Sequence, residues 1–175
     1  LEQNNDLPTI YIDGWLFPNP LGIIKHRREI VDYFKPREDI LRAVRVFLIP
    51  IRKKYDHIVG VHIRQGDYKS FKGGKYFIGQ ARVREILDEY LREYKKDRVR
   101  TCFVVTSNGV VEKEKFAGLN IVVSSKDFIE DLFILVSSHA IIGSDSSFGN
   151  FAAYYADIPH IVLKNEPIDW AYCRG

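Results

Sequence analysis

The sequence predicts an α/β protein built on a doubly wound, mostly parallel sheet of about five strands. Two observations support this prediction. The expected strands are continuous apolar runs instead of alternating polar and apolar residues, which is typical of strands buried on both faces. Segments with the apolar spacing of helices separate these runs by short connections, as in a parallel sheet with crossover helices.

Five apolar runs carry the β-branched and aromatic residues that strands favour. A further short strand is expected over Thr9–Asp13, before an aromatic, proline-rich loop at Gly14–Gly22. A long polar loop is expected at Tyr68–Gly79, after the first strand of the sheet. The five strands are expected at Ile58–Arg64, Thr101–Thr106, Leu119–Val123, Ala140–Gly143 and His160–Leu163.

Helical spacing of apolar residues marks five segments between and before these strands. Pro50 is expected to end the first helix, because proline lacks a backbone donor and crowds the preceding turn. In the fourth, Ser125 or a neighbour is expected to form the cap, and Phe128 is expected to face inward. The helices are expected at Lys35–Phe47, Ala81–Tyr94, Val110–Phe116, Ser125–Val136 and Ser147–Tyr155.

The length of 175 residues suits one domain with a sizeable core. We divide the chain into an N-terminal lead-in and helical segment (1–57), a sheet-bearing domain (58–164) and a C-terminal tail (165–175). The chain contains no methionine, so we expect a fragment or processed chain whose further domains lie outside it. The net charge of +3 suits phosphate-bearing small ligands and is too small to indicate nucleic acid.

The end of the first expected strand, Gly60–Tyr68, is the first candidate for a ligand site. Alternate side chains of a strand point to opposite faces, so His62 and Arg64 share one face. Gly66 and Asp67 follow in the turn. A histidine and an arginine side by side at a buried strand end are typical of an anion site, although two solvated polar residues would give the same pattern.

Two more polar segments follow strands of the same sheet. Ser107 and Asn108 follow the second strand, and Gly143–Gly149 runs from the fourth strand directly into a helix. The second segment offers hydroxyl groups and free backbone N–H groups at a helix start, which suits phosphate. Simple N-capping by Ser146 or Asp145 explains it equally well. Because the carboxyl ends of parallel strands share one edge, these segments can converge on a diphosphate.

Other chemistries lack a sequence signal. The chain has no P-loop, no GxGxxG turn and no GxSxG elbow. It has no HExxH motif or paired cysteines, so we expect no metal site. It also has no apolar run of about 18 residues that would span a membrane.

Several of these segments carry a family resemblance. His62-Ile63-Arg64-Gln65-Gly66-Asp67-Tyr68 resembles the HxRRGDY motif of the α-1,2-fucosyltransferases (glycosyltransferase family 11-like), inverting enzymes that use GDP-L-fucose. Ser146–Tyr154 resembles their SSFSWWAAYL segment. Gln65 replaces the second arginine, and Gly149-Asn150-Phe151 replaces the Ser-Trp-Trp cluster. The family's N-terminal GGLGNQ-type segment is absent.

The resemblance implies the C-terminal, donor-binding half of a GT-B fold, with 58–164 as a Rossmann-like GDP-fucose-binding domain. The implied activity is metal-independent, inverting transfer of L-fucose from GDP-L-fucose to a hydroxyl of a glycan acceptor, with no cofactor. A non-catalytic module that binds GDP or a nucleotide sugar is the alternative. The implied partners are a glycan and an N-terminal acceptor-binding half. The expected compartment is the cytoplasm, with membrane association in a longer protein left open.

The resemblance also assigns residue roles. Arg64 and His62 are expected to contact the diphosphate and, with Asp67, to carry catalysis. Asp67 could orient Arg64, contact the donor or act as a base, and the orienting role is favoured. The residues expected to bind the donor are Gly66, Tyr68, Ser107, Asn108, Asp145, Ser146, Ser147 and Phe148.

Overall fold

The computed structural model describes residues 19–94 and 100–171, which fall into two compact units divided between Lys35 and Pro36. In the first unit, the described residues form two short helices, α1 (Pro20–Lys25) and α2 (Arg27–Tyr33). The loop expected through Gly22 is therefore wrong from Pro20 onward. Asn19 caps α1 by accepting a hydrogen bond from the Gly22 N–H at 2.9 Å, and proline suits the first helical position. The strand expected at Thr9–Asp13 lies outside the described residues.

The second unit contains a five-stranded sheet in which every neighbouring pair of strands is parallel. The order β3-β2-β1-β4-β5 confirms the predicted doubly wound α/β class. The chain crosses from one half of the sheet to the other after β3, so the switch point lies between the neighbouring strands β1 and β4. Ligands of such sheets bind at the switch point, beyond the carboxyl ends of the strands. The strands are β1 (His57–Ile63), β2 (Thr101–Ser107), β3 (Ile121–Val123), β4 (Ala140–Gly143) and β5 (His160–Val162).

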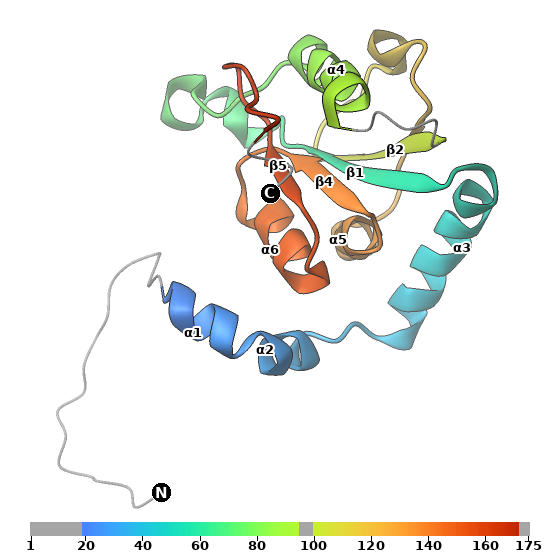
Figure 1. Ribbon diagram of the computed structural model, residues 1–175, viewed down its shortest axis with the longest axis vertical. Coiled ribbons are helices and arrows are strands. Elements are labelled where there is room, and N and C mark those ends of the chain that lie inside the picture. The colour runs from blue at the N-terminus through green and yellow to red at the C-terminus, as the bar shows by residue number, and fades with distance from the viewer. Residues whose placement is uncertain (1–18, 95–99, 172–175) are drawn as a thin grey trace, which may run out of the picture. The chain divides into compact units, whose positions relative to one another are not determined.

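Helices cover both faces of this sheet (Figure 1). Val59, Val61 and Ile63 of β1 enter the core cluster on the α4 side. Ile58 belongs to a second cluster with side chains of α3 and α5, so the strand is buried on both faces. The helices are α3 (Glu38–Lys54), α4 (Gln80–Glu89), α5 (Phe128–Val136) and α6 (Ser147–Ala156).

The prediction that Pro50 ends the first long helix is wrong. Helix α3 begins at Glu38 and continues through Pro50 to Lys54. Pro50 removes only the hydrogen bond to the carbonyl of Val46, a residue on the exposed side of the helix where water can replace it. Ile51, in contrast, is buried with the second core cluster and holds the last turn against the sheet. Burial of that turn outweighs the missing bond.

Smaller differences have local causes. The helix expected at Val110–Phe116 is a 3-10 turn over Lys113–Phe116 only, because the Gln80 side chain accepts a hydrogen bond from the Glu112 N–H and keeps the preceding chain extended. The cap of helix α5 lies two residues beyond Ser125, because Asp127 forms a capping box with Glu130. Helix α4 ends at Glu89 and continues as a π turn, Tyr90–Tyr94. The loop expected at Tyr68–Gly79 contains two short 3-10 turns.

Helix α3 belongs to the unit of the sheet and not to a separate N-terminal segment that ends at residue 57. Trp170 likewise returns to the core: it is buried, its ring lies 6.1 Å from that of Tyr90, and its indole N–H donates to Glu89 at 3.1 Å. Neither segment is therefore an appendage of the sheet. Within the described residues, no helix is both long and apolar enough to cross a membrane.

Candidate functional site

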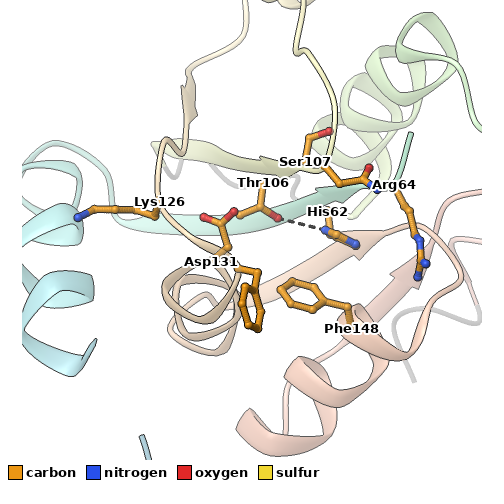
Figure 2. A pocket seen from close by; sticks show the side chains of 9 residues that line it. His62, Arg64, Thr106, Ser107, Lys126, Asp131 and Phe148 are labelled. Atoms are coloured by element: carbon orange, nitrogen blue, oxygen red, sulfur yellow. Dashed lines mark hydrogen bonds between the residues drawn. The ribbon is translucent and has the colours of Figure 1, made fainter. Parts of the chain in front are cut away.

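His62 lies at the carboxyl end of β1, directly above the switch point between β1 and β4. Its side chain is buried, and its Nδ1 lies 3.2 Å from the Thr106 hydroxyl on the neighbouring strand (Figure 2). The ring centroids of His62 and Phe148 are 4.8 Å apart. Burial, assisted by the charges of Arg64 and His160, lowers the pKa of His62 to about 4. At neutral pH the ring is therefore uncharged and can offer its Nε2 to a ligand.

Arg64 follows on the same face, and its guanidinium meets Asp67 at two points. Its Nε and Nη2 donate to the two carboxylate oxygens at 2.9 and 2.7 Å. The same guanidinium lies over the Tyr68 ring, 4.7 Å from its centroid, and the Arg64 backbone N–H donates to the Ser144 hydroxyl at 3.0 Å. Tyr68 donates to the backbone carbonyl of Asp145 at 2.6 Å. The β1 turn and the segment before α6 are thus joined around one cation.

Gln65, between these residues, points away from the cavity. Its side chain is buried and donates to the Ser107 hydroxyl and to the Val110 carbonyl, both at 3.0 Å. It accepts a third hydrogen bond from Gln80 of α4 at 3.0 Å. Asn108 then accepts the backbone N–H groups of Gln65 and Gly66, at 2.7 and 3.2 Å. This network locks the ends of β1 and β2 together, and it accounts for a glutamine where the resembled motif has arginine.

The segment after β4 begins α6 with a side-chain cap. Ser146 is the N-cap and accepts a hydrogen bond from the Gly149 N–H at 3.5 Å, so the capping role left open for this residue is present. Ser144 is buried behind Arg64, and Ser147 is exposed. Phe148 places its ring against His62. Of this segment, only Phe148 lines the cavity described next.

A cavity of about 270 Å³ opens where β1, β2, α5 and α6 meet. It brings together five of the residues predicted from the sequence: His62, Arg64, Ser107, Asn108 and Phe148. Asp67 and Tyr68 support Arg64 from outside the lining, and Ser146 and Ser147 do not line it. Gly66 and Asp145 border two other clefts. The full lining is His62, Arg64, Thr106, Ser107, Asn108, Lys126, Phe128, Asp131 and Phe148.

The side of the cavity formed by α5 and the residues before it was not predicted from the sequence. Lys126, Phe128 and Asp131 line the cavity, and Phe128, expected to face inward, is 72% exposed. Capping by Asp127 starts α5 at Phe128 and turns this ring to solvent. Asp131 is half-buried, accepts a hydrogen bond from Ser124, and has its pKa raised by burial. The one feature of the sequence that could have indicated these residues is their position, because they too follow the carboxyl end of a strand, β3.

The model of the family described as "Glycosyl transferase family 11" matches residues 17–169. The chain belongs to this family. Curated relatives include "Galactoside alpha-(1,2)-fucosyltransferase 2" of Mus musculus, 28% identical, and of Pongo pygmaeus, 27% identical. Each alignment covers 94% of this chain, and the chain spans about half of each relative's length, 50% and 51%.

Among solved structures, the chain is similar to "POFUT1 in complex with GDP-fucose", with a TM-score of 0.59. This likeness covers 77% of this chain and 48% of that chain at 12% identity, so it supports the fold alone. The apo form of POFUT1 gives a TM-score of 0.56. Together with the parallel sheet, these matches confirm the predicted class, one Rossmann-like half of a GT-B fold. Among the described residues, no group of three or more His, Cys, Asp or Glu side chains is placed to hold a metal ion.

Proposed function

We propose that this chain binds GDP-L-fucose and supplies the donor half of a fucosyltransferase that acts on a hydroxyl of a glycan. The observation that carries the proposal is the cavity at the switch point, with His62 and Arg64 at one end, in a member of glycosyl transferase family 11. The named relatives, two α-(1,2)-fucosyltransferases, support the choice of sugar and linkage. We further propose that transfer inverts the anomeric carbon and needs no metal.

The diphosphate would occupy the end of the cavity beside β1. Arg64 carries a permanent charge into this end, and Asp67 fixes the plane of its guanidinium. Neutral His62 would donate from Nε2 to a phosphate oxygen in the tautomer whose Nδ1 accepts the Thr106 hydroxyl proton, which otherwise goes to the Val61 carbonyl at 3.5 Å. A cation and a neutral donor can bind a diphosphate together without two buried positive charges repelling each other.

The guanine base would occupy the end of the cavity beside α5. Guanine presents two neighbouring donors, N1–H and the 2-amino group, to which a carboxylate such as that of Asp131 is complementary. Adenine has an acceptor at its N1 and would face the carboxylate unfavourably. Phe128 and Phe148 offer aromatic faces on which a base can stack. The nucleotide would thus span the cavity from Asp131 to Arg64.

Bond cleavage would place growing negative charge on the β-phosphate of the departing GDP. Arg64 is already held in place by Asp67, so it can stabilise this charge without reorganising during the reaction. Transfer also needs a base to take the proton of the acceptor hydroxyl. Within this site we assign Asp67 to Arg64 instead, because both of its carboxylate oxygens already accept hydrogen bonds from the guanidinium.

Calorimetric titration with GDP and ADP tests donor binding directly. We expect GDP to bind, ADP to bind at least tenfold more weakly, and Arg64→Ala to lose most GDP affinity. Asp131→Asn should narrow the preference for GDP over ADP. The matched control is Arg100→Ala. Arg100 donates to Asp56 from the same two nitrogen atoms, Nε and Nη2, but it precedes β2 and so lies at the opposite end of the strands. No heat of GDP binding at millimolar concentration, or equal loss in both arginine variants, would overturn the proposed site.

A non-catalytic GDP-binding module is the second candidate, because the chain spans only about half the length of its curated relatives, 50% and 51%. The two candidates differ in catalysis and not in GDP binding. Release of free fucose from GDP-fucose, or transfer to a glycan by a full-length protein, favours the enzyme. The same assay with and without a chelator tests whether a metal is needed.

A further inference from the structure

His160 joins β5 to α6 beside the candidate site, although it does not line the cavity. Its Nδ1 lies 2.9 Å from the side-chain oxygen of Asn150. That oxygen can only accept, so Nδ1 carries the proton and Nε2 holds a lone pair. Nε2 is buried and has no hydrogen-bond partner among the described residues. Buried polar atoms without a hydrogen-bond partner are rare in folded proteins and call for an explanation. For Nε2 the explanation is the place of the ring in the fold, where this nitrogen faces Gly143 and Gly149.

The imidazole edge fits between two glycines. A Cβ at Gly143, the last residue of β4, would meet His160 Nε2 at 3.2 Å. A Cβ at Gly149, in the first turn of α6, would meet the same nitrogen at the same distance. Any side chain at either position would press on the ring. The two glycines therefore make room for His160, and the ring in turn fills the space between β4 and α6.

These contacts fall at the two ends of one segment, Ser144–Phe148. Gly143 precedes this segment, while Gly149 and Asn150 follow it. The segment receives the backbone N–H of Arg64 on Ser144, and it places Phe148 against His62 in the cavity wall. One histidine thus contacts both ends of the loop that supports the two candidate donor-binding residues of β1.

The same residues are those in which the chain departs from the family segment it resembles. Gly149 and Asn150 stand where that segment has serine and tryptophan. In this structure both contact His160, the glycine by leaving space and the asparagine by accepting a hydrogen bond. Both of these differing residues therefore lie against the same histidine, His160.

We propose that His160 is a positioning residue, which fixes the Ser144–Phe148 segment for binding of the nucleotide diphosphate. This inference rests on the proposed donor site. His160 acts through Asn150, Gly143 and Gly149, and it touches neither nucleotide nor sugar. Its removal should loosen the segment and weaken nucleotide binding, while the sheet itself stays folded.

The test measures amide hydrogen exchange and GDP affinity for three variants. In His160→Ala, we expect the amide exchange rates of residues 144–149 to rise about tenfold, and the dissociation constant for GDP to rise by the same factor. A tenfold change corresponds to the loss of one hydrogen bond together with its packing. In His160→Asn, the amide nitrogen can still donate to Asn150, so a partial recovery of both quantities is expected. Asn150→Ala keeps the ring and removes only its partner, so it covers the case in which His160→Ala fails to fold.

His139→Ala is the matched control. His139 is also a histidine held by a hydrogen bond, from the Ile58 N–H at 3.0 Å, but it precedes β4 and lies at the opposite edge of the sheet. The His139→Ala variant should leave the amide exchange rates of residues 144–149 unchanged. The inference fails if His160→Ala and Asn150→Ala exchange like the parent, or if His139→Ala loosens the segment equally. Amide exchange is measured without nucleotide. If the parent protein does not bind GDP, the proposed function is wrong, but the exchange rates still show whether His160 holds the segment in place.

Discussion

Asp67 and Arg64 form a two-point ion pair at the mouth of the cavity, with Nε–Oδ1 and Nη2–Oδ2 distances of 2.9 and 2.7 Å. The hydrogen bonds from Arg64 hold the pKa of the Asp67 carboxyl below its ordinary value. A carboxylate held in this way is a poor proton acceptor. The pair is therefore better suited to orienting a cation than to general-base catalysis.

Replacing Asp67 with Asn separates these two roles. The amide keeps one oxygen acceptor but loses the charge, so Arg64 should be held less firmly. We expect the dissociation constant for GDP to rise by about tenfold, equivalent to roughly 1.4 kcal/mol, as measured by calorimetry. Asp56→Asn, which alters the comparable pair with Arg100, is the control. If GDP affinity is unchanged while the transfer rate of a full-length protein collapses, Asp67 is a base instead.

Burial of His62 makes the stability of the fold depend on pH. Its pKa is about 4 in the folded chain, against an ordinary value of 6.5, so the unfolded chain binds more protons between these values. The contribution of His62 to the free energy of unfolding is therefore fully present above pH 6.5 and is lost as the pH is lowered toward 4. This loss is on the order of 3 kcal/mol.

A His62→Asn variant isolates this contribution, because the carboxylates titrate in both proteins and cancel in the comparison. We expect the stability difference between parent and variant, from urea unfolding, to shift in favour of the variant between pH 6.5 and pH 4. Gln80→Asn, at a buried residue that does not titrate, is the control and should show no such shift. A constant difference across this range would mean that His62 is not desolvated as described.

The parts of this protein that follow from local sequence are those that depend on one segment at a time. Continuous apolar runs predicted the buried strands, and the alternation of side chains placed His62 and Arg64 together. Features that depend on two segments were missed. Pro50 stays helical because Ile51 packs in a core cluster with residues of β1, β2 and α5. The outward turn of Phe128 is the exception, because it follows from a local cap at Asp127 and not from a second segment.

The candidate site shows the same division. The β1 and β4 ends carry recognisable polar motifs, and the cavity lining includes residues from β1 and from the helix after β4. Asp131 and Lys126 have no motif of their own, because a carboxylate in a helix and a lysine before it are common surface residues. Only the fold brings them to the cavity that Phe148 also lines (Figure 2). Knowledge of strand order would have been needed to include them.

Gln65 provides a test of the network that locks β1 to β2. Gln65→Ala removes three side-chain hydrogen bonds at once, although its partners keep others: Ser107 with Ile63 and Gly109, and Gln80 with the Val110 carbonyl. We expect a loss of about 2–3 kcal/mol in the free energy of unfolding. Asn120→Ala, which removes an amide with two weaker bonds at the other edge of the sheet, should cost less. Equal costs would show that the Gln65 network has no special weight.

Gly60 lies in the middle of β1, where helix α5 packs closely on the strand. A Cβ there would meet Leu135 Cδ2 at 2.7 Å and the Ser138 hydroxyl at 3.0 Å. The Leu135 backbone Cα, 3.4 Å away, is in ordinary contact, but the Leu135 side chain is fully buried and has little room to move aside. If helix α5 moves with this side chain, the shift would reach the cavity, since α5 also carries Asp131.

Gly60→Ala should therefore destabilise the fold by about 1–3 kcal/mol through overpacking, and it should also weaken GDP binding. Gly79→Ala is the control, because a Cβ at Gly79 meets nothing within 4 Å and its backbone, with φ −66°, accepts alanine without strain. Urea unfolding and GDP titration of both variants decide the matter. A Gly60→Ala protein as stable as the parent would show that Leu135 can move aside, and that close packing of α5 does not set the width of the cavity.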